Sequence, residues 1–78
     1  MLRVSYVEDD GRGQTDYETV LCNASDTPFQ ILASHSVNPE TRNIYLNGRY
    51  IAKKKLEQPF SVLVGRVNMI FLTVRCKN

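Results

Sequence analysis

Apolar and polar side chains alternate over several stretches of the chain, which is typical of strands with one buried face. In residues 2–7 Leu, Val and Tyr alternate with Arg, Ser and Val. A polar turn with two glycines follows at residues 8–13, and residues 15–22 predict a second strand rich in Thr, Tyr and Val. The short connection predicts an antiparallel hairpin. The register of its second strand is open, because the core side could carry either Tyr17, Thr19 and Leu21 or Val20 and Cys22.

A short helix is predicted after this hairpin. Thr27 can cap it with its hydroxyl, and Pro28 suits the first helical position. Gln30 lies three residues after the cap and can complete a capping box. Asn38-Pro39 is expected to end the helix, because the residue before proline is disfavoured in the α region. The predicted apolar face consists of Phe29, Leu32 and Ala33, with Ile31 beside it.

A tight hairpin is predicted at residues 43–51. Ile44 and Leu46 alternate with polar or aromatic neighbours, which indicates a third strand. Asn47-Gly48 is the strongest short signal for a type I′ turn, since that turn requires positive φ at both central residues. Residues 49–51 then return as a short fourth strand.

The remainder is less regular until the last strand. Residues 52–55 predict a solvated loop, and Leu56 and Phe60 are expected to anchor it to the core. Residues 62–64 could form either a strand or a buried turn. A long final strand is predicted in which Ile70, Leu72, Val74 and Cys76 alternate with Met69, Phe71, Thr73 and Arg75.

Length and charge narrow the classes of protein. With 78 residues the chain has room for one domain, residues 1–78, which buries only about 60% of its unfolded surface. The net charge of +2 does not by itself indicate nucleic acid. No apolar run approaches the roughly 20 residues that span a bilayer, and the chain does not open with a signal-peptide core. We therefore expect a cytoplasmic protein without membrane insertion.

The sequence predicts no catalytic residue, metal site or cofactor. Its two cysteines lack the spacing of a zinc or redox site. His35 is the only histidine, and at the helix end its protonated form could stabilise the helix C-terminus. The adjacent carboxylates of residues 8–10 lack the ligand spacing of a calcium loop. We expect a protein that is not an enzyme.

The order of these elements resembles ubiquitin and the β-grasp fold. Four places carry the resemblance, which covers nearly the whole chain: residues 25–27 at the helix start, 42–49 around the hairpin, Leu56 and 70–75 in the last strand. The predicted helix is several residues shorter than ubiquitin's. The resemblance implies an α+β fold in which a mixed sheet of four to five strands packs on one short helix. It also implies a central last strand, parallel to the first.

Two further expectations follow from this resemblance. Cys22 and Cys76 would lie several strand residues apart, beyond the roughly 7 Å Cα separation that a disulfide allows, so we expect two free thiols. Conjugating ubiquitin-like proteins and related sulfur carriers react through a flexible C-terminal Gly-Gly. Residues 75–78, RCKN, carry side chains that would block entry into an activating enzyme, so we expect no conjugation through this tail.

One face of the predicted sheet is a candidate interaction surface. If Ile70, Leu72 and Val74 face the core, their neighbours in the last strand face outward. Aromatic residues, Met and Arg are enriched in interface cores, and the ubiquitin family commonly binds partners on this face. Scattered exposed apolar residues are normal, and the chain's own tail or a second copy could cover the face. The predicted interaction surface consists of Arg3, Tyr45, Met69, Phe71 and Arg75.

The main hypothesis is therefore a non-catalytic ubiquitin-like interaction module or adaptor that binds a protein, or a second copy of itself, through this face. A second hypothesis is a single-stranded nucleic-acid binder that stacks bases on Tyr45 and Phe71. The small net charge and the acidic turn count against it. A divergent sulfur-carrier-like protein is the third and weakest alternative.

Overall fold

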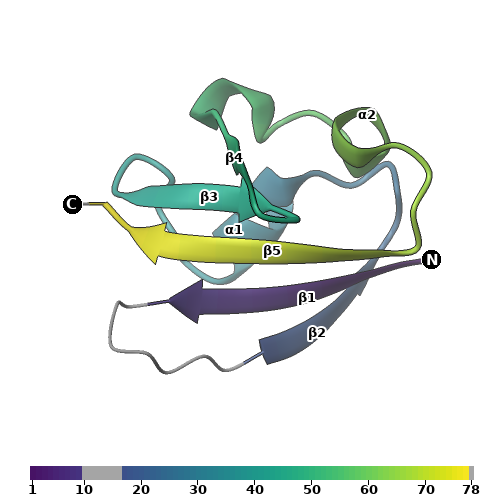
Figure 1. Ribbon diagram of the computed structural model, residues 1–78, viewed down its shortest axis with the longest axis horizontal. Coiled ribbons are helices and arrows are strands. Elements are labelled where there is room, and N and C mark those ends of the chain that lie inside the picture. Colours follow the sequence, from purple (N-terminus) through teal and green to yellow (C-terminus); the bar gives the residue numbers. More distant parts are fainter. Residues whose placement is uncertain (10–16, 78) are drawn as a thin grey trace.

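The computed structural model describes residues 1–9 and 17–77 and contains one five-stranded sheet. The sheet order is β2-β1-β5-β3-β4, so the last strand lies in the centre (Figure 1). β5 is parallel to β1, and every other neighbouring pair is antiparallel. This confirms the predicted α+β, β-grasp fold. Its elements are β1 (Leu2–Asp9), β2 (Tyr17–Cys22), α1 (Pro28–Ser34), β3 (Arg42–Leu46), β4 (Arg49–Ile51), a 3₁₀ helix (Lys53–Lys55), α2 (Phe60–Val64) and β5 (Met69–Cys76).

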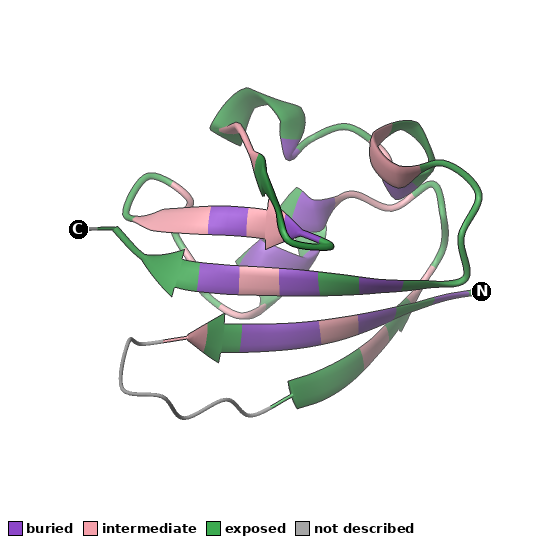
Figure 2. Cartoon of the chain, viewed as in Figure 1, coloured by how far each residue is buried: buried purple, intermediate pink, exposed green. Residues whose placement is uncertain are grey.

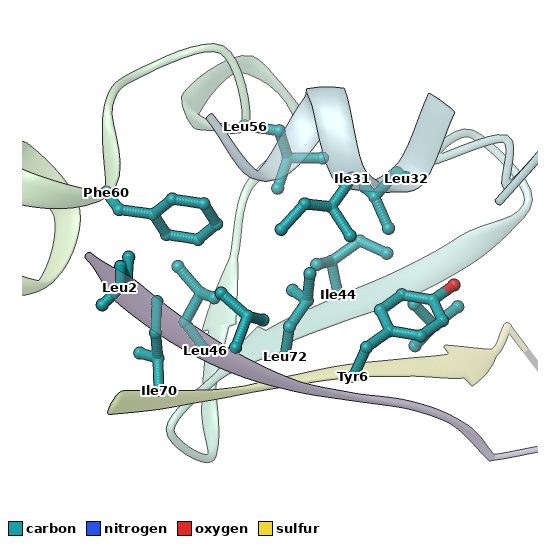
Figure 3. Packing of buried hydrophobic residues seen from close by; sticks show 12 residues of the cluster. Leu2, Tyr6, Ile31, Leu32, Ile44, Leu46, Leu56, Phe60, Ile70 and Leu72 are labelled. Atoms are coloured by element: carbon teal, nitrogen blue, oxygen red, sulfur yellow. The ribbon is translucent and has the colours of Figure 1, made fainter. Parts of the chain in front are cut away.

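The core lies between α1 and one face of the sheet (Figure 3). Alternate residues of β1, β3 and β5 point toward the helix, which produces the banded burial along β5 in Figure 2. Ile31 and Leu32 contribute from the helix. The buried cluster consists of Leu2, Val4, Tyr6, Ile31, Leu32, Ile44, Leu46, Leu56, Phe60, Ile70, Leu72 and Val74.

The sheet decides the register that the sequence left open. Leu2 lies opposite Cys22 and Val4 opposite Val20, so the half-buried Val20 and Cys22 share the core side. The other three candidates, Tyr17, Thr19 and Leu21, are exposed. Residues 8 and 9 continue β1 rather than forming the turn, and residues 10–16, which include the rest of that predicted turn, lie outside the described part.

The start of α1 is confirmed, but its predicted apolar face is wrong. Thr27 accepts a hydrogen bond from the Gln30 amide, and the Gln30 side chain accepts one from the Thr27 amide. The helical residues that are buried are Pro28, Ile31 and Leu32, which share one face at spacings of three and four. Phe29 and Ala33 are exposed because their positions lie about 100° around the helix from that face.

The helix also ends earlier than Asn38-Pro39. Ser36 has φ 59°, and its amide donates to the Ala33 carbonyl. The Val37 amide donates to the Leu32 carbonyl, which completes a Schellman motif, and the Val37 side chain packs on the core. Ser36, rather than a glycine, occupies the left-handed position, so the sequence alone did not predict that the helix ends here.

The segment between β4 and β5 is more regular than predicted. Lys53–Lys55 form a turn of 3₁₀ helix rather than a loop, and residues 62–64 belong to α2 rather than to a strand or turn. Both predicted anchors are confirmed, since Leu56 and Phe60 are 1% and 0% exposed. Backbone hydrogen bonds from Phe60 to Asp26 and from Phe29 to Leu56 tie this segment to the start of α1.

The cysteines lie near opposite ends of the sheet. Cys22 is opposite Leu2 at the beginning of β1, whereas Cys76 is opposite Arg42 at the end of β5. Both are free thiols, as predicted. Cys76 is exposed even though its alternation placed it with the core residues of β5, because it is the last residue of the strand and lies beyond the buried cluster.

Candidate protein-interaction surface

The sheet face opposite α1, called here the open face, carries a row of side chains that crosses all five strands and includes three tyrosines. Strand register places Tyr17, Val7, Thr73, Tyr45 and Tyr50 next to one another in that order. Side chains that are directly opposite in neighbouring strands lie on the same face of the sheet. Three tyrosines from β2, β3 and β4 therefore share the open face.

Phe71 joins this row from the next position toward the start of β5. Its ring meets Tyr17 edge to face, with 6.5 Å between the ring centroids. The contact reaches across β1, where Val7 lies opposite Tyr17 and is only 3% exposed. The open face thus has an apolar patch of its own, with Val7 as its buried member and two partly exposed rings beside it.

A second aromatic pair lies on the open face toward its β4 edge. The rings of Tyr45 and Tyr50 are 5.9 Å apart and are also edge to face. The Arg75 guanidinium lies 5.9 Å from the centroid of the Tyr45 ring, and its Nε is 3.5 Å from Asp9 Oδ2. A cation–π contact with Tyr45 on β3 and a charge contact with Asp9 on β1 therefore hold the Arg75 side chain in place on the open face.

The opposite end of the open face combines a cation with aliphatic residues. Arg3 lies opposite Leu21 on one side and opposite Met69 on the other. Leu21 is 60% and Met69 48% exposed. Together with Met1 and Asn68 they line a hollow of about 530 Å³.

All five residues predicted for the interaction surface lie on the open face, but they form two groups. Arg75 contacts Tyr45 at one end, and Arg3 adjoins Met69 at the other. Arg75 comes six positions after Met69 in β5, which is a separation of about 20 Å. Phe71 lies between the two groups along β5, with its ring against Tyr17.

Three exposed large hydrophobic residues of the open face were not predicted: Tyr17, Leu21 and Tyr50. Tyr50 could have been found, because a two-residue turn at Asn47-Gly48 fixes the pairing of β3 and β4 and puts Tyr50 opposite Tyr45. The pairing of β2 with β1 decides which β2 side chains face the core, and no local sequence signal comparable to the Asn47-Gly48 turn predicts that pairing.

His35 belongs to a separate polar cluster at the end of α1. Its ring stacks on Tyr6 with 4.0 Å between centroids. Nδ1 lies 2.9 Å from the Ile31 carbonyl and Nε2 lies 3.0 Å from a Glu18 carboxylate oxygen. Desolvation lowers the pKa of His35, but the hydrogen bonds to Ile31 and Glu18 outweigh it, so this pKa is raised. Both nitrogens face acceptors, and only the imidazolium can donate to both.

The same cluster includes the Tyr6 hydroxyl, which donates to Glu8 at 2.9 Å. Burial and the nearby carboxylate raise the pKa of Tyr6, so the phenol stays neutral. These contacts give each polar group a structural partner. Among the residues described, no group of three or more His, Cys, Asp or Glu side chains is arranged to hold a metal ion.

Comparison with known proteins identifies the fold. No protein-family model matches the sequence, and no curated protein shows significant sequence similarity to it. The structure is similar to that of a ubiquitin-like protein from the hyperthermophilic archaeon Caldiarchaeum subterraneum, with a TM-score of 0.59 and 12% identity. The match covers 99% of this chain and 97% of the other. The chain therefore has a ubiquitin-like fold. Within residues 1–9 and 17–77, no helix has the length and apolar character that crossing a bilayer requires.

Proposed function

We propose that residues 1–78 form one ubiquitin-like domain that acts as a non-catalytic protein-interaction module or adaptor through its open face. The observation that carries this proposal is the concentration of exposed apolar side chains on that face. Of the nine exposed large hydrophobic residues among those described, five lie there. They are Tyr17 (64% exposed), Leu21 (60%), Tyr50 (57%), Met69 (48%) and Phe71 (46%).

The composition of the open face suits a protein partner. Contiguous exposed apolar patches mark interaction sites more often than scattered residues do, and this face joins five strands without interruption. Tyr and Arg are over-represented among residues that dominate binding energy. Arg3 and Arg75, at its two ends, supply charge for orienting the partner. The expectations of a cytoplasmic location and of no conjugation through the C-terminus stay predictions.

The test compares Phe71→Ala with Phe29→Ala. Both phenylalanines are partly exposed, 46% and 42%, but Phe29 lies on α1, on the other side of the sheet. Each tagged variant is used to capture partners from its native cells, and self-association is measured by sedimentation velocity. We expect Phe71→Ala to lose a partner or self-association that the wild type and Phe29→Ala retain, with all three giving the same circular dichroism spectrum.

The stability cost of the change is small enough to keep this test interpretable. Phe71 is nearly half exposed, so its truncation should cost about 1 kcal/mol, less than a fully buried phenylalanine. Retention of the same partners and the same sedimentation coefficient by folded Phe71→Ala would show that the open face is not the binding surface.

Nucleic-acid binding through the same rings is the second candidate. The four aromatic rings favour it, but Arg75 lies against the Tyr45 ring, and the rings are packed against one another in pairs. A titration with labelled single-stranded RNA at low salt separates the two candidates, because binding to phosphates weakens steeply as salt rises. Binding that is absent, or insensitive to salt, removes this candidate.

A further inference from the structure

A groove of about 460 Å³ lies between β4 and α2, outside the open face. Figure 1 shows α2 on the β4 side of the sheet, beyond its edge strand. The floor of the groove includes Leu46 and Ile51 of the hairpin and the aliphatic residues of α2. Tyr50, which is 57% exposed, forms its border with the open face.

α2 carries one aliphatic residue, Val62, that its anchoring to the core does not bury. Phe60 is its one buried residue and fixes the helix to the core. The next aliphatic residues, Val62, Leu63 and Val64, all line the groove, and Val62 remains 66% exposed. Leu63 and Val64 are partly buried against the core, so the exposed Val62 and Tyr50 supply most of the apolar surface that is open to a ligand.

The charges around this groove have one sign. Arg49 and Lys55 line it, and none of the described residues that line it is acidic. The neighbouring lysines are placed differently: Lys53 pairs with Glu40, and Lys54 lines a separate hollow that also contains Glu57. The 3₁₀ turn therefore directs Lys55 to the groove, whereas Lys53 and Lys54 lie beside Glu40 and Glu57 respectively.

The hairpin also offers backbone groups at the groove. In a two-residue type I′ hairpin the residues that flank the turn, Leu46 and Arg49, form the hydrogen-bonded pair. The next pair, Tyr45 and Tyr50, is then non-hydrogen-bonded, and the Tyr50 amide and carbonyl point away from β3 along the free edge. An extended peptide can hydrogen-bond to such an edge, whereas a compact small molecule uses it less well.

From these features we propose that the groove between β4 and α2 binds a short, extended acidic peptide segment. Its aliphatic side chains pack on Val62, Leu63 and Tyr50, and its flanking carboxylates pair with Arg49 and Lys55. This site shares Tyr50 with the open face but does not depend on the function proposed for that face.

The test uses a fluorescein-labelled octapeptide with two central leucines between aspartates, followed by fluorescence anisotropy. We expect saturable binding with a dissociation constant below about 1 mM that weakens as salt rises. Lys55→Glu should weaken binding about fivefold or more, because it reverses a charge at the rim. Lys54→Glu is the matched control, since it makes the same change in net charge on the same turn and should leave binding within about twofold.

The apolar part of the site is tested in the same assay. Val62→Ser should weaken binding, whereas Val67→Ser, at an exposed valine that does not line the groove, should not. Phe71→Ala should leave binding unchanged, so the outcome is independent of the open face. Equal losses from Lys54→Glu and Lys55→Glu would show a general charge effect and overturn the proposal.

Three other outcomes would also overturn it. The first is the absence of any saturable binding by the aspartate–leucine peptide. The second is equal binding of versions with lysine in place of aspartate or serine in place of leucine. The third is Lys55-dependent binding of a labelled oligonucleotide but not of the peptide, which would make the site one for a different polyanion.

Discussion

The cluster around His35 should make the stability of this protein depend on pH in a predictable direction. The imidazolium donates to the Ile31 carbonyl at the end of α1 and to Glu18 on β2, and its pKa is raised in the folded state. A raised pKa means that the folded protein binds the proton more tightly than the unfolded chain. The stabilisation is fully present below the unfolded pKa, near 6.5, and is lost as pH rises through the folded value.

The size of this effect follows from two contacts. Glu18 is 63% exposed, so its pair with His35 is screened by solvent and contributes about 0.2–1 kcal/mol. A charge at a helix C-terminus adds about 0.3–1 kcal/mol. The sum, about 1 kcal/mol, corresponds to a fall in melting temperature of about 4–8 °C for a chain of this size between about pH 5.5 and pH 8.

Because His35 is the only histidine in the chain, a histidine pKa measured in this protein can be assigned to it directly. Urea unfolding across this pH range gives the free energy of unfolding, and an NMR titration of the His35 ring gives its folded pKa directly. His35→Gln should remove most of the pH dependence, whereas Glu18→Gln should remove only the part due to the ion pair. If His35→Gln kept the wild-type pH slope, or if the folded pKa lay at or below 6.5, the reasoning would be refuted.

Two further predictions concern residues with positive φ. Ser36→Gly should raise the free energy of unfolding by about 1 kcal/mol, since glycine relieves the left-handed conformation at φ 59°; an unchanged urea midpoint would contradict this. Asn47→Ala should lower it by about 1–2 kcal/mol, because Asn47 has φ 50° and its side chain accepts from the Phe71 amide at 2.9 Å. Asn47→Gly keeps the backbone conformation, so a loss as large as alanine's would assign the whole effect to the hydrogen bond.

Local sequence signals determined the elements whose physics is local. The capping box at Thr27 and Gln30 forms within four residues, and the type I′ turn depends only on the conformations open to Asn47 and Gly48. The alternation in residues 69–74 required nothing beyond the two-residue period of a strand. For the same reason the outward positions of Met69, Phe71 and Tyr45 could be predicted once the core sides were known.

The tertiary structure decided features that depend on distant partners. The side of β2 that faces the core follows from its pairing with β1, which brings Tyr17 and Leu21 to the open face. The buried face of α1 follows from where the sheet lies, since Phe29 and Ile31 are equally apolar when considered alone. α2 is placed by a backbone hydrogen bond from Phe60 to Asp26, just before α1, which brings the Phe60 ring into the core.

The candidate interaction surface likewise has one part that the sequence predicted and one part that only the tertiary structure decided. The sequence by itself placed five residues on one face, because side-chain direction in a strand is a local property. Only the tertiary structure could show that they form two groups at opposite ends of the open face, and that one lysine of three lines the groove beside α2. The order of strands across the sheet decides the first, and the packing of the 3₁₀ turn and α2 beside β4 decides the second; both depend on contacts between residues far apart in the chain.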